Sequence, residues 1–195
     1  MTAPTIILLA AGKSTRMRGK DKLLEPVAGE PLLRVMARRA CKAAATRVVV
    51  GADQSLRERA LDGIDVAVVY APDNAGMAAS IAAGVRGLSG PVLIMLADMP
   101  EVTAYDLHLL IALSAQAPDA ILRAAAADGT PGHPVLFPPG LVAELATLTG
   151  DRGAAPVIHA HANKVHLVPL KGNRALTDLD TPEDWATWRA QNPLI

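Results

Sequence analysis

The sequence has few aromatic residues, one cysteine and no net charge, and each scarcity excludes a class of protein. Aromatic side chains make up 3% of the 195 residues, so a core must be built from Ala, Val, Leu and Ile. Cys41 is the only cysteine, which excludes an intramolecular disulfide and a cysteine-based zinc site and fits a reducing cytoplasm. Lys plus Arg equal Asp plus Glu at 19 each, a balance that indicates neither nonspecific nucleic-acid binding nor a polybasic membrane anchor.

Long hydrophobic runs are missing as well. The apolar run at Ile6–Ala11 is too short to cross a bilayer and has no cationic segment before it, so we recognise no secretion signal and expect a cytoplasmic protein. Hydrophobic residues still make up 51% of the chain, which favours a folded protein. The length suits one α/β domain and no linker is visible, so we expect a single domain over residues 1–195.

Short apolar runs alternate with amphipathic stretches through the first half of the chain. This alternation predicts a doubly wound α/β fold with a mostly parallel sheet, to which the less regular second half adds an antiparallel part. The predicted strands are Thr5–Ala10, Arg47–Val50, Val66–Tyr70, Pro91–Leu96, Ala120–Ala125, Val135–Phe137 and Val165–Leu170. The predicted helices are Leu32–Ala45, Gln54–Leu61, Met77–Val85, Thr103–Ala115, Leu141–Leu148 and Pro182–Arg189, and Ala127–His133 is expected to be a loop.

The first predicted strand opens into a loop with glycine, hydroxyl groups and cations. Gly12 lets the backbone approach a ligand, Ser14 and Thr15 carry hydroxyl donors, and Arg16 and Lys22 supply positive charge. In doubly wound sheets ligands bind outside the carboxyl ends of the strands, where this loop meets those after the third and fourth strands. The combination favours an oxyanion such as a nucleoside triphosphate, although the P-loop spacing and the GxGxxG pattern are both absent.

Five segments spread along the chain form a recognisable set. They are LAAGKSTRMRGKDKLL in the first loop, GMAASI at Gly76–Ile81, LADMP at Leu96–Pro100, GTPGHPVLF at Gly129–Phe137 and DLDTPEDW at Asp178–Trp185. In this order they resemble the MobA-like nucleotidyltransferases, whose first loop is roughly L-A-[AG]-G-x-S-x-R-M-G-G-x-[DN]-K. More narrowly, they are similar to the molybdenum cofactor cytidylyltransferases.

The resemblance implies transfer of CMP from CTP to a phosphate of the molybdenum cofactor, with release of pyrophosphate. Within the family, Ala-Ala-Gly in the first loop accompanies CTP and Ala-Gly-Gly accompanies GTP, so Ala11 favours CTP here. A molybdenum hydroxylase is then a candidate partner. The nucleotide-binding residues that the resemblance implies are Ala10, Ala11, Gly12, Lys13, Ser14, Thr15, Arg16, Lys22, Gly76, Met77, Ser80 and Asp98.

Asp98 follows a continuous apolar strand, where a carboxylate is costly unless a cation faces it. Beside a triphosphate that cation would be Mg²⁺, which prefers one or two carboxylates with phosphates and water. The alternative is an aspartate that caps a helix or forms a turn. The resemblance favours metal binding and makes Asp180 the second ligand, with Asp178 in support. Lys22, Arg16 and Asp98 are the expected catalytic residues.

The acceptor side is less clear from the sequence. His133 lies in a constrained Pro-Gly-His-Pro segment, where a lone histidine is more often a structural hydrogen-bonding group than a catalyst. By resemblance this segment faces the acceptor, and we expect His133, Asp151 and Arg152 to bind it. The family pattern G-D-x-G-A-R lacks its arginine here, because Ala155 stands in that place, and Arg152 is the candidate replacement.

The expected reaction is in-line attack of an acceptor phosphate on the α-phosphorus of the donor. An ionised phosphate needs no general base, so positioning and charge neutralisation should supply the catalysis. Alternatives within the family use GTP, or a sugar or alcohol phosphate as acceptor. A different class is a non-catalytic carrier or insertion chaperone for the molybdenum cofactor. A nucleotide-dependent oxidoreductase is disfavoured because no dinucleotide motif exists.

Overall fold

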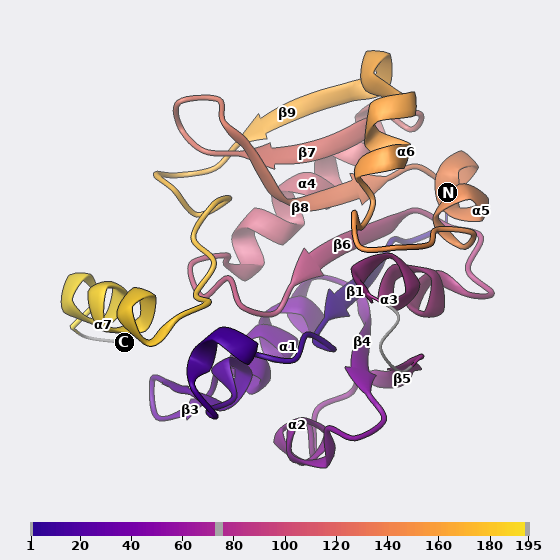
Figure 1. Ribbon diagram of the computed structural model, residues 1–195. Coiled ribbons are helices and arrows are strands. Elements are labelled where there is room, and N and C mark those ends of the chain that lie inside the picture. Colours follow the sequence, from indigo (N-terminus) through magenta and orange to yellow (C-terminus); the bar gives the residue numbers. More distant parts are fainter. Residues whose placement is uncertain (1, 73–75, 194–195) are drawn as a thin grey trace.

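Runs rich in Val, Leu and Ile form a sheet, and the stretches between them form helices that cover it (Figure 1). The computed structural model describes residues 2–72 and 76–193. The strands of the main sheet are β1 (Thr5–Leu9), β4 (Ala45–Gly51), β5 (Ala67–Ala71), β6 (Val92–Leu96), β7 (Ile121–Ala125), β8 (Pro131–Phe137) and β9 (Val165–Pro169). Two short strands, β2 (Pro26–Val27) and β3 (Glu30–Pro31), pair with each other in a separate hairpin.

The main sheet combines a parallel part and an antiparallel part, in the order β5-β4-β1-β6-β8-β7-β9. β1 lies between β4 and β6 and runs parallel to both, and β5 extends the parallel part beyond β4. β8 runs antiparallel to β6 and β7, while β9 is parallel to β7. The prediction of a doubly wound, mostly parallel sheet with an antiparallel addition in the second half is confirmed.

Helices cover both faces of this sheet. The helices are α1 (Leu32–Ala43), α2 (Ser55–Ala60), α3 (Gly76–Val85), α4 (Ala104–Gln116), α5 (Val142–Leu145), α6 (Ala155–Ala160) and α7 (Pro182–Gln191). α1 and α4 pack together on one face, and α3 and α5 pack together on the other (Figure 1). Thr103 and Thr181 cap α4 and α7 through reciprocal capping boxes, as their sequences suggest. Of the helices formed by residues 2–72 and 76–193, none has the length and apolar character needed to span a bilayer.

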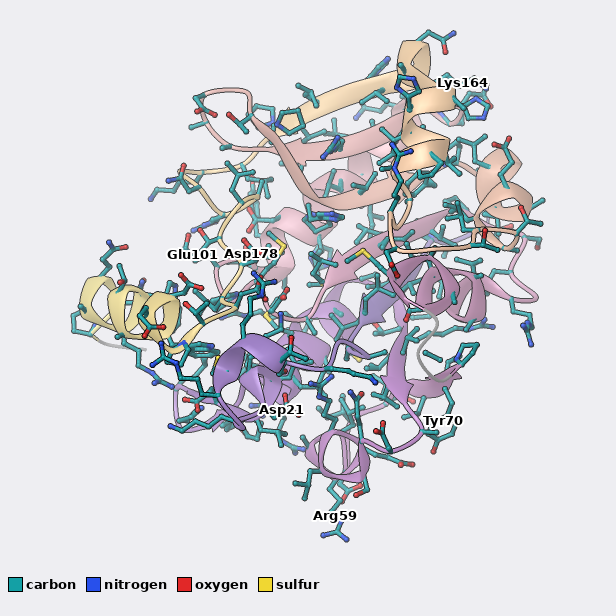
Figure 2. All side chains as sticks on the ribbon, viewed as in Figure 1. Asp21, Arg59, Tyr70, Glu101, Lys164 and Asp178 are labelled. Carbon is teal, nitrogen blue, oxygen red and sulfur yellow. The ribbon has the colours of Figure 1, made fainter. Side chains whose placement is uncertain are left out.

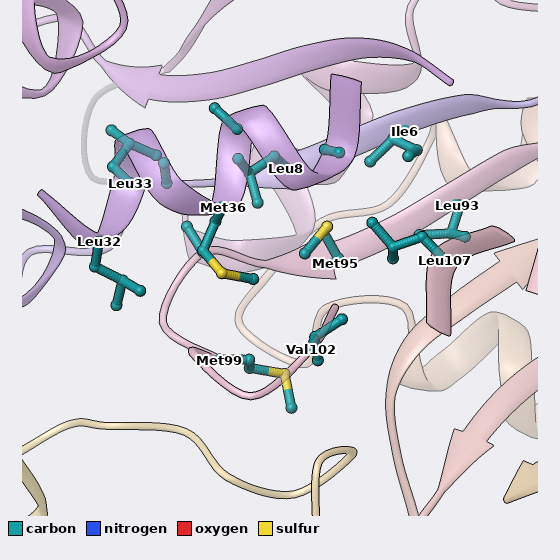
Figure 3. Close-up of a cluster of buried hydrophobic side chains, with 14 of the residues drawn as sticks. Ile6, Leu8, Leu32, Leu33, Met36, Leu93, Met95, Met99, Val102 and Leu107 are labelled. Atoms are coloured by element: carbon teal, nitrogen blue, oxygen red, sulfur yellow. The ribbon is translucent and has the colours of Figure 1, made fainter. Parts of the chain in front are cut away.

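The hydrophobic core consists of two layers, one on each face of the sheet. Ile6 and Leu8 belong to the layer under α1 and α4, Ile7 belongs to the other layer, and all three side chains are fully buried. Figure 3 shows part of the first layer, where Met36 of α1 and Met95 of β6 share one cluster. Full burial of one such side chain contributes roughly 1.5–3 kcal/mol, so the ends of the central strands are firmly anchored.

The second half differs locally from the sequence predictions. The loop predicted at residues 127–133 ends earlier, because β8 begins at Pro131. A strand can contain these prolines because Pro131 is its first residue and Pro134 lies where the register with β7 shifts. The helix predicted at residues 141–148 is a 3₁₀ turn at Pro139–Leu141 followed by the short α5. The sequence did not predict α6, which is too short to show a helical period.

Candidate active site

The loop after β1 is fastened by a buried arginine. Arg57 lies on α2 and is 1% exposed. Its guanidinium donates to both carboxylate oxygens of Asp21 at 2.7 and 2.8 Å, to the Ser14 hydroxyl at 3.0 Å and to the Ala10 carbonyl. Burial alone would raise the pKa of the Asp21 carboxyl, but the hydrogen bonds and charge of Arg57 outweigh it and lower that pKa. Asp21 therefore balances the buried cation, and both ends of the loop are held to α2.

Ser14 serves the loop itself rather than facing outward as a phosphate donor. Its hydroxyl donates to Asp21 Oδ1 at 3.2 Å and accepts from the backbone N–H of Lys22 at 3.3 Å. Ser14 and Arg18 both adopt left-handed backbone conformations, with φ of 52° and 53°. Arg18, which replaces a family glycine, thus keeps the glycine turn, and its guanidinium lies 2.5 Å from Glu183 Oε1.

Lys22 joins two carboxylates from distant parts of the chain. Its Nζ donates to Asp98, which follows β6, and to Asp180 Oδ1 at 2.6 Å, just before α7. Burial alone would lower the pKa of Lys22, but the charges and hydrogen bonds of Asp98 and Asp180 raise it, so the ammonium form persists. Arg16 adds a second cation, 2.5 Å from Asp180 Oδ2, at the exposed rim. The segment that leads into α7 passes beside the first loop (Figure 1).

Asp98 keeps one carboxylate oxygen unused. Its Oδ1 is buried and has no hydrogen-bond partner among the residues that the structure describes. Such an oxygen is costly to bury, and it fits a cation ligand. Among residues 2–72 and 76–193, no cluster of three or more His, Cys, Asp or Glu could hold a metal by protein groups alone. The donor set of Asp98 and Asp180 therefore fits a metal ion whose other ligands are phosphate oxygens and water.

Backbone contacts fix the two carboxylates relative to each other. Arg39 of α1 donates to the carbonyls of Pro100 and Val102 at 2.6 and 2.9 Å, which supports the Asp98 loop from behind. The backbone N–H of Leu179 donates to the Asp98 carbonyl at 3.1 Å, which ties the segment before α7 to the same loop. Asp178 lies on this segment, and burial followed by the charges of Asp98 and Asp180 raises its pKa. Hydrogen bonds thus hold α1, the Asp98 loop and the segment before α7 in fixed positions relative to one another.

A first cavity of about 640 Å³ opens at the carboxyl ends of β1, β4, β5 and β6. The predicted nucleotide-binding residues that line it are Ala10, Ala11, Gly12, Lys13, Lys22, Gly76, Met77, Ser80 and Asp98, whereas Ser14, Thr15 and Arg16 are not among its lining residues. The Ser80 hydroxyl donates to the Gly76 carbonyl at 3.3 Å, inside its own helix. Gln54, which was not predicted, fixes the wall by donating to the Ala11 carbonyl at 3.1 Å. Residues 73–75, in the loop after the third predicted strand, lie outside the described residues.

Gly76 allows the loop at residues 150–153 to close against this cavity. Its φ is +71°, and a Cβ there would lie 2.1 Å from Asp151 Oδ1 and 2.9 Å from the Gly150 carbonyl. The Ala78 N–H donates to that carbonyl at 3.3 Å. Asp151, predicted to bind the acceptor, therefore lines the first cavity.

A second cavity of about 630 Å³ adjoins the first, and Leu9 and Met77 line both. It contains His133 and Arg152, the other two predicted acceptor residues, together with Arg123 and Ala155. Ala155 therefore supplies no charge to this wall at the position where the family pattern has an arginine. The apolar part of the lining includes Ile94, Val135, Phe137, Ile158, Val165 and Leu167.

His133 brings a neutral ring to the second cavity. Burial, and then the charge of Arg123, lower its pKa to about 4, while Asp98 acts weakly in the opposite direction. The ring Nδ1 is buried without a hydrogen-bond partner in the described part of the chain. A Cβ at Gly132 would lie 1.9 Å from the Ala175 carbonyl, which accepts from the His133 N–H at 2.9 Å. Only a glycine at position 132 allows β8 to approach this closely the segment that leads to Asp180.

The sequence missed Arg57, although a signal was present. The helix containing it was predicted, and a spacing of four places Arg57 on the same helix face as Leu61, which is 4% exposed. Leu56, the apolar neighbour that would be expected inside, is 60% exposed. The i, i+4 spacing therefore pointed to a buried arginine.

Comparison with known proteins gives matches along most of the chain. The description "MobA-like NTP transferase domain" applies to a family model that matches residues 6–165. The chain is 26% identical to a molybdenum cofactor guanylyltransferase from Serratia proteamaculans over 194 residues, which cover 97% of this chain and 96% of that protein. It is 36% identical over 107 residues to the bifunctional protein GlmU of Bdellovibrio bacteriovorus, covering 53% of this chain and 23% of that protein. The chain thus spans about a quarter of the length of the GlmU proteins that it matches.

Solved structures agree with the sequence match. Rv0371c from Mycobacterium tuberculosis superposes with a TM-score of 0.79 at 30% identity, covering 96% of this chain and 98% of that one. The same protein in complex with manganese gives a TM-score of 0.76 at 27% identity and covers 95% of this chain and 97% of that one. The family match over residues 6–165, together with a fold shared along nearly the whole chain, shows that the chain belongs to the MobA-like NTP transferase domain family.

Proposed function

We propose that this protein transfers a nucleoside monophosphate from a nucleoside triphosphate to a phosphorylated small molecule, with release of pyrophosphate. The observation that carries the proposal is the group formed by Lys22, Asp98 and Asp180, of which Lys22 and Asp98 line the first cavity. It places an ammonium ion and two carboxylates, one with a free buried oxygen, where strand ends leave room for a ligand. A triphosphate with its metal ion needs charges of both signs in this arrangement.

The reaction follows from these charges. An acceptor phosphate oxygen attacks the α-phosphorus in line, a new P–O bond forms, and the bond to the β-phosphate breaks as pyrophosphate leaves. Lys22 neutralises charge at the α-phosphate, while Arg16 and the N–H groups near Gly12 hold the β- and γ-phosphates. The acceptor phosphate is already ionised near neutral pH, so the neutral His133 need not act as a base.

Asp98 and Asp180 are the residues that would hold Mg²⁺. When bound, the ion neutralises phosphate charge and orients the triphosphate. The manganese complex of Rv0371c supports a divalent cation in a related protein. The buried Oδ1 of Asp98 supports the same role in this chain.

We propose CTP as the donor. The Ala11 methyl occupies a fixed place in the wall of the first cavity, because Gln54 holds the Ala11 carbonyl. The methyl makes the cavity narrower than a glycine would, and a narrower cavity favours a pyrimidine base. GTP is the second candidate, favoured by the molybdenum cofactor guanylyltransferase that aligns with 97% of this chain. Ala11→Gly should widen the first cavity and shift the nucleotide preference toward GTP.

The second cavity is the proposed acceptor site, and the molybdenum cofactor is the proposed acceptor. Its adjacency to the first cavity supports this placement, because Leu9 and Met77 line both and an acceptor there would face the donor. A molybdenum hydroxylase would be the protein that receives the product. A sugar or alcohol phosphate would use the same residues.

A nucleotide panel tests the proposal. Purified protein is mixed with Mg²⁺, molybdenum cofactor and CTP, GTP, UTP or ATP, and pyrophosphate release is measured. We expect the fastest release with CTP and a higher GTP-to-CTP ratio for Ala11→Gly. Faster release with GTP would overturn the donor assignment. Cofactor binding without release from any nucleotide would identify a carrier and overturn the enzymatic proposal.

A further inference from the structure

The second cavity contains a cation that no carboxylate among the described residues balances. Arg123 of β7 is partly buried, and its Nε donates to the Gly132 carbonyl at 3.1 Å. Among residues 2–72 and 76–193 it forms no ion pair with an Asp or Glu, and burial lowers the pKa of its guanidinium. Arg57, in contrast, is buried against Asp21. A partly buried guanidinium without a counterion is costly, so an external anion is its expected partner.

The sheet directs Arg123 into this cavity. Ile121 belongs to the core layer on the α3 and α5 face, and residues two apart in a strand share a face. The register between β7 and β8 shifts between Arg123 and Ala125, so β8 bulges near His133. The bulge brings Arg123 and His133 to the same cavity wall, where the cation lowers the pKa of the ring.

The lining defines the chemistry of a ligand. It contains Arg123, Arg152, His133 and His159 but no Asp or Glu, and most of the remaining wall is apolar. A ligand that matches it has an anionic group and an apolar or ring-shaped body. Arg152 is exposed, so water screens its charge more than that of Arg123.

We propose that Arg123 binds the anionic group of the acceptor and determines which acceptors enter the second cavity, with the neutral His133 ring as a hydrogen-bonding neighbour. The word acceptor rests on the proposed function. The ligand class, an organic phosphate with an apolar or aromatic body, follows from the cavity itself. Arg123 rather than Arg152 then supplies the charge that Ala155 does not.

Phenyl phosphate is a suitable probe because it combines a dianion with a ring and requires no nucleotide. Its binding to the full chain is measured by calorimetry for wild type, Arg123→Met and the matched control Arg152→Met. We expect Arg123→Met to weaken binding about tenfold or more, as loss of a charged hydrogen bond does, and Arg152→Met to change it less than about threefold. Equal effects of the two variants, or no effect of Arg123→Met, would overturn the proposal.

Three further measurements support the test. Phenol lacks the anion, so wild-type protein should bind it at least about tenfold more weakly than phenyl phosphate, and similar affinities would count against an anion site. Arg123→Lys, which retains the charge, should recover part of the affinity if Arg123→Met folds poorly. In the pyrophosphate assay, Arg123→Met should raise KM for the acceptor and leave KM for the nucleotide unchanged. A protein without transferase activity would refute the proposed function, while phenyl phosphate would still decide the role of Arg123.

Discussion

Lys22 lines the first cavity, Arg16 and Arg57 lie beside it, and each of the three contacts a carboxylate of the chain. In the second cavity, Arg123 contacts only a backbone carbonyl among residues 2–72 and 76–193. Cations paired within the protein hold loops in place before any ligand arrives. A cation without such a partner contributes its interaction only when a ligand supplies the negative charge. The two halves of the proposed site therefore differ in what their charges do in the ligand-free protein.

This difference predicts different consequences of substitution. Removing a partner in the first cavity leaves an uncompensated charge and should cost stability, activity or both. Removing Arg123 relieves an uncompensated charge, so it should cost acceptor binding with little loss of stability.

The largest effect is expected for Asp98→Asn. The substitution keeps the shape of the side chain but removes the negative charge that faces Lys22, and it replaces the carboxylate proposed to bind Mg²⁺ by a neutral amide, which is a weaker ligand. We expect pyrophosphate release to fall about 10²–10³-fold or more, as it does when one group that stabilises transition-state charge is lost. The exposed Asp119→Asn is the matched control and should behave like wild type. Near-normal activity of Asp98→Asn in excess Mg²⁺ would contradict the metal role.

Arg57→Met should produce the largest loss of stability. It removes four hydrogen bonds that join the first loop to α2 and leaves Asp21 without its counterion. Breaking a buried pair from one side costs about 3–5 kcal/mol, which urea unfolding can measure. KM for the nucleotide should rise as well, because the loop loses its shape.

Arg59→Met is the control for that experiment, since Arg59 lies on the same helix and points away from the protein (Figure 2). Its effect on the free energy of unfolding should stay within about 0.5 kcal/mol. If both variants lose the same small amount, Arg57 is not the fastening of the first loop.

The sequence predicted much of the fold because the central strands carry their own signal. Ile6, Ile7 and Leu8 are apolar and buried on both faces, and such runs are visible without knowing their neighbours. Lys22 and Asp98 could be named because each lies in a short motif directly after a strand, where parallel sheets place their sites.

The supporting arginines could not be found in the same way. The spacing of Arg57 and Leu61 indicates that Arg57 is buried, but the groups that Arg57 and Arg123 contact lie far away in the sequence, so no local pattern identifies them. The bulge that brings His133 to the second cavity depends on the pairing of β7 with β8, which no single strand encodes.

The acid dependence of stability distinguishes the second cavity through His133. Its pKa is about 4 in the folded protein, below the unperturbed value near 6.5. Between these values the unfolded chain binds a proton that the folded protein does not. The stabilisation of the folded protein by the neutral His133 ring is therefore complete above about pH 6.5. It is lost progressively as the pH falls toward 4, by up to about 3 kcal/mol. Urea unfolding between pH 4 and 7 measures the loss.

His133→Asn is the comparison variant for this experiment, because carboxylates of the chain also titrate in this pH range. The wild-type free energy of unfolding should fall more steeply than that of the variant. Arg123→Met should show a pH dependence between those of the wild type and His133→Asn, because the charge of Arg123 is the second cause of the lowered His133 pKa. Parallel curves for wild type and His133→Asn would show that the ring titrates normally.

The smallest effect is expected for Arg18→Gly, which restores the family glycine in the first loop. Arg18 has φ 53°, a left-handed conformation that costs a non-glycine residue roughly 1–2 kcal/mol. Glycine removes this strain, but it gives the unfolded chain more freedom and loses the exposed pair with Glu183, which contributes about 0–1 kcal/mol. The net change in unfolding free energy should therefore stay within about 1 kcal/mol, with pyrophosphate release unchanged. A loss of activity would mean that Arg18 contacts a substrate. Arg18 would then resemble Arg123, because its charge would contribute to the site only when a ligand binds.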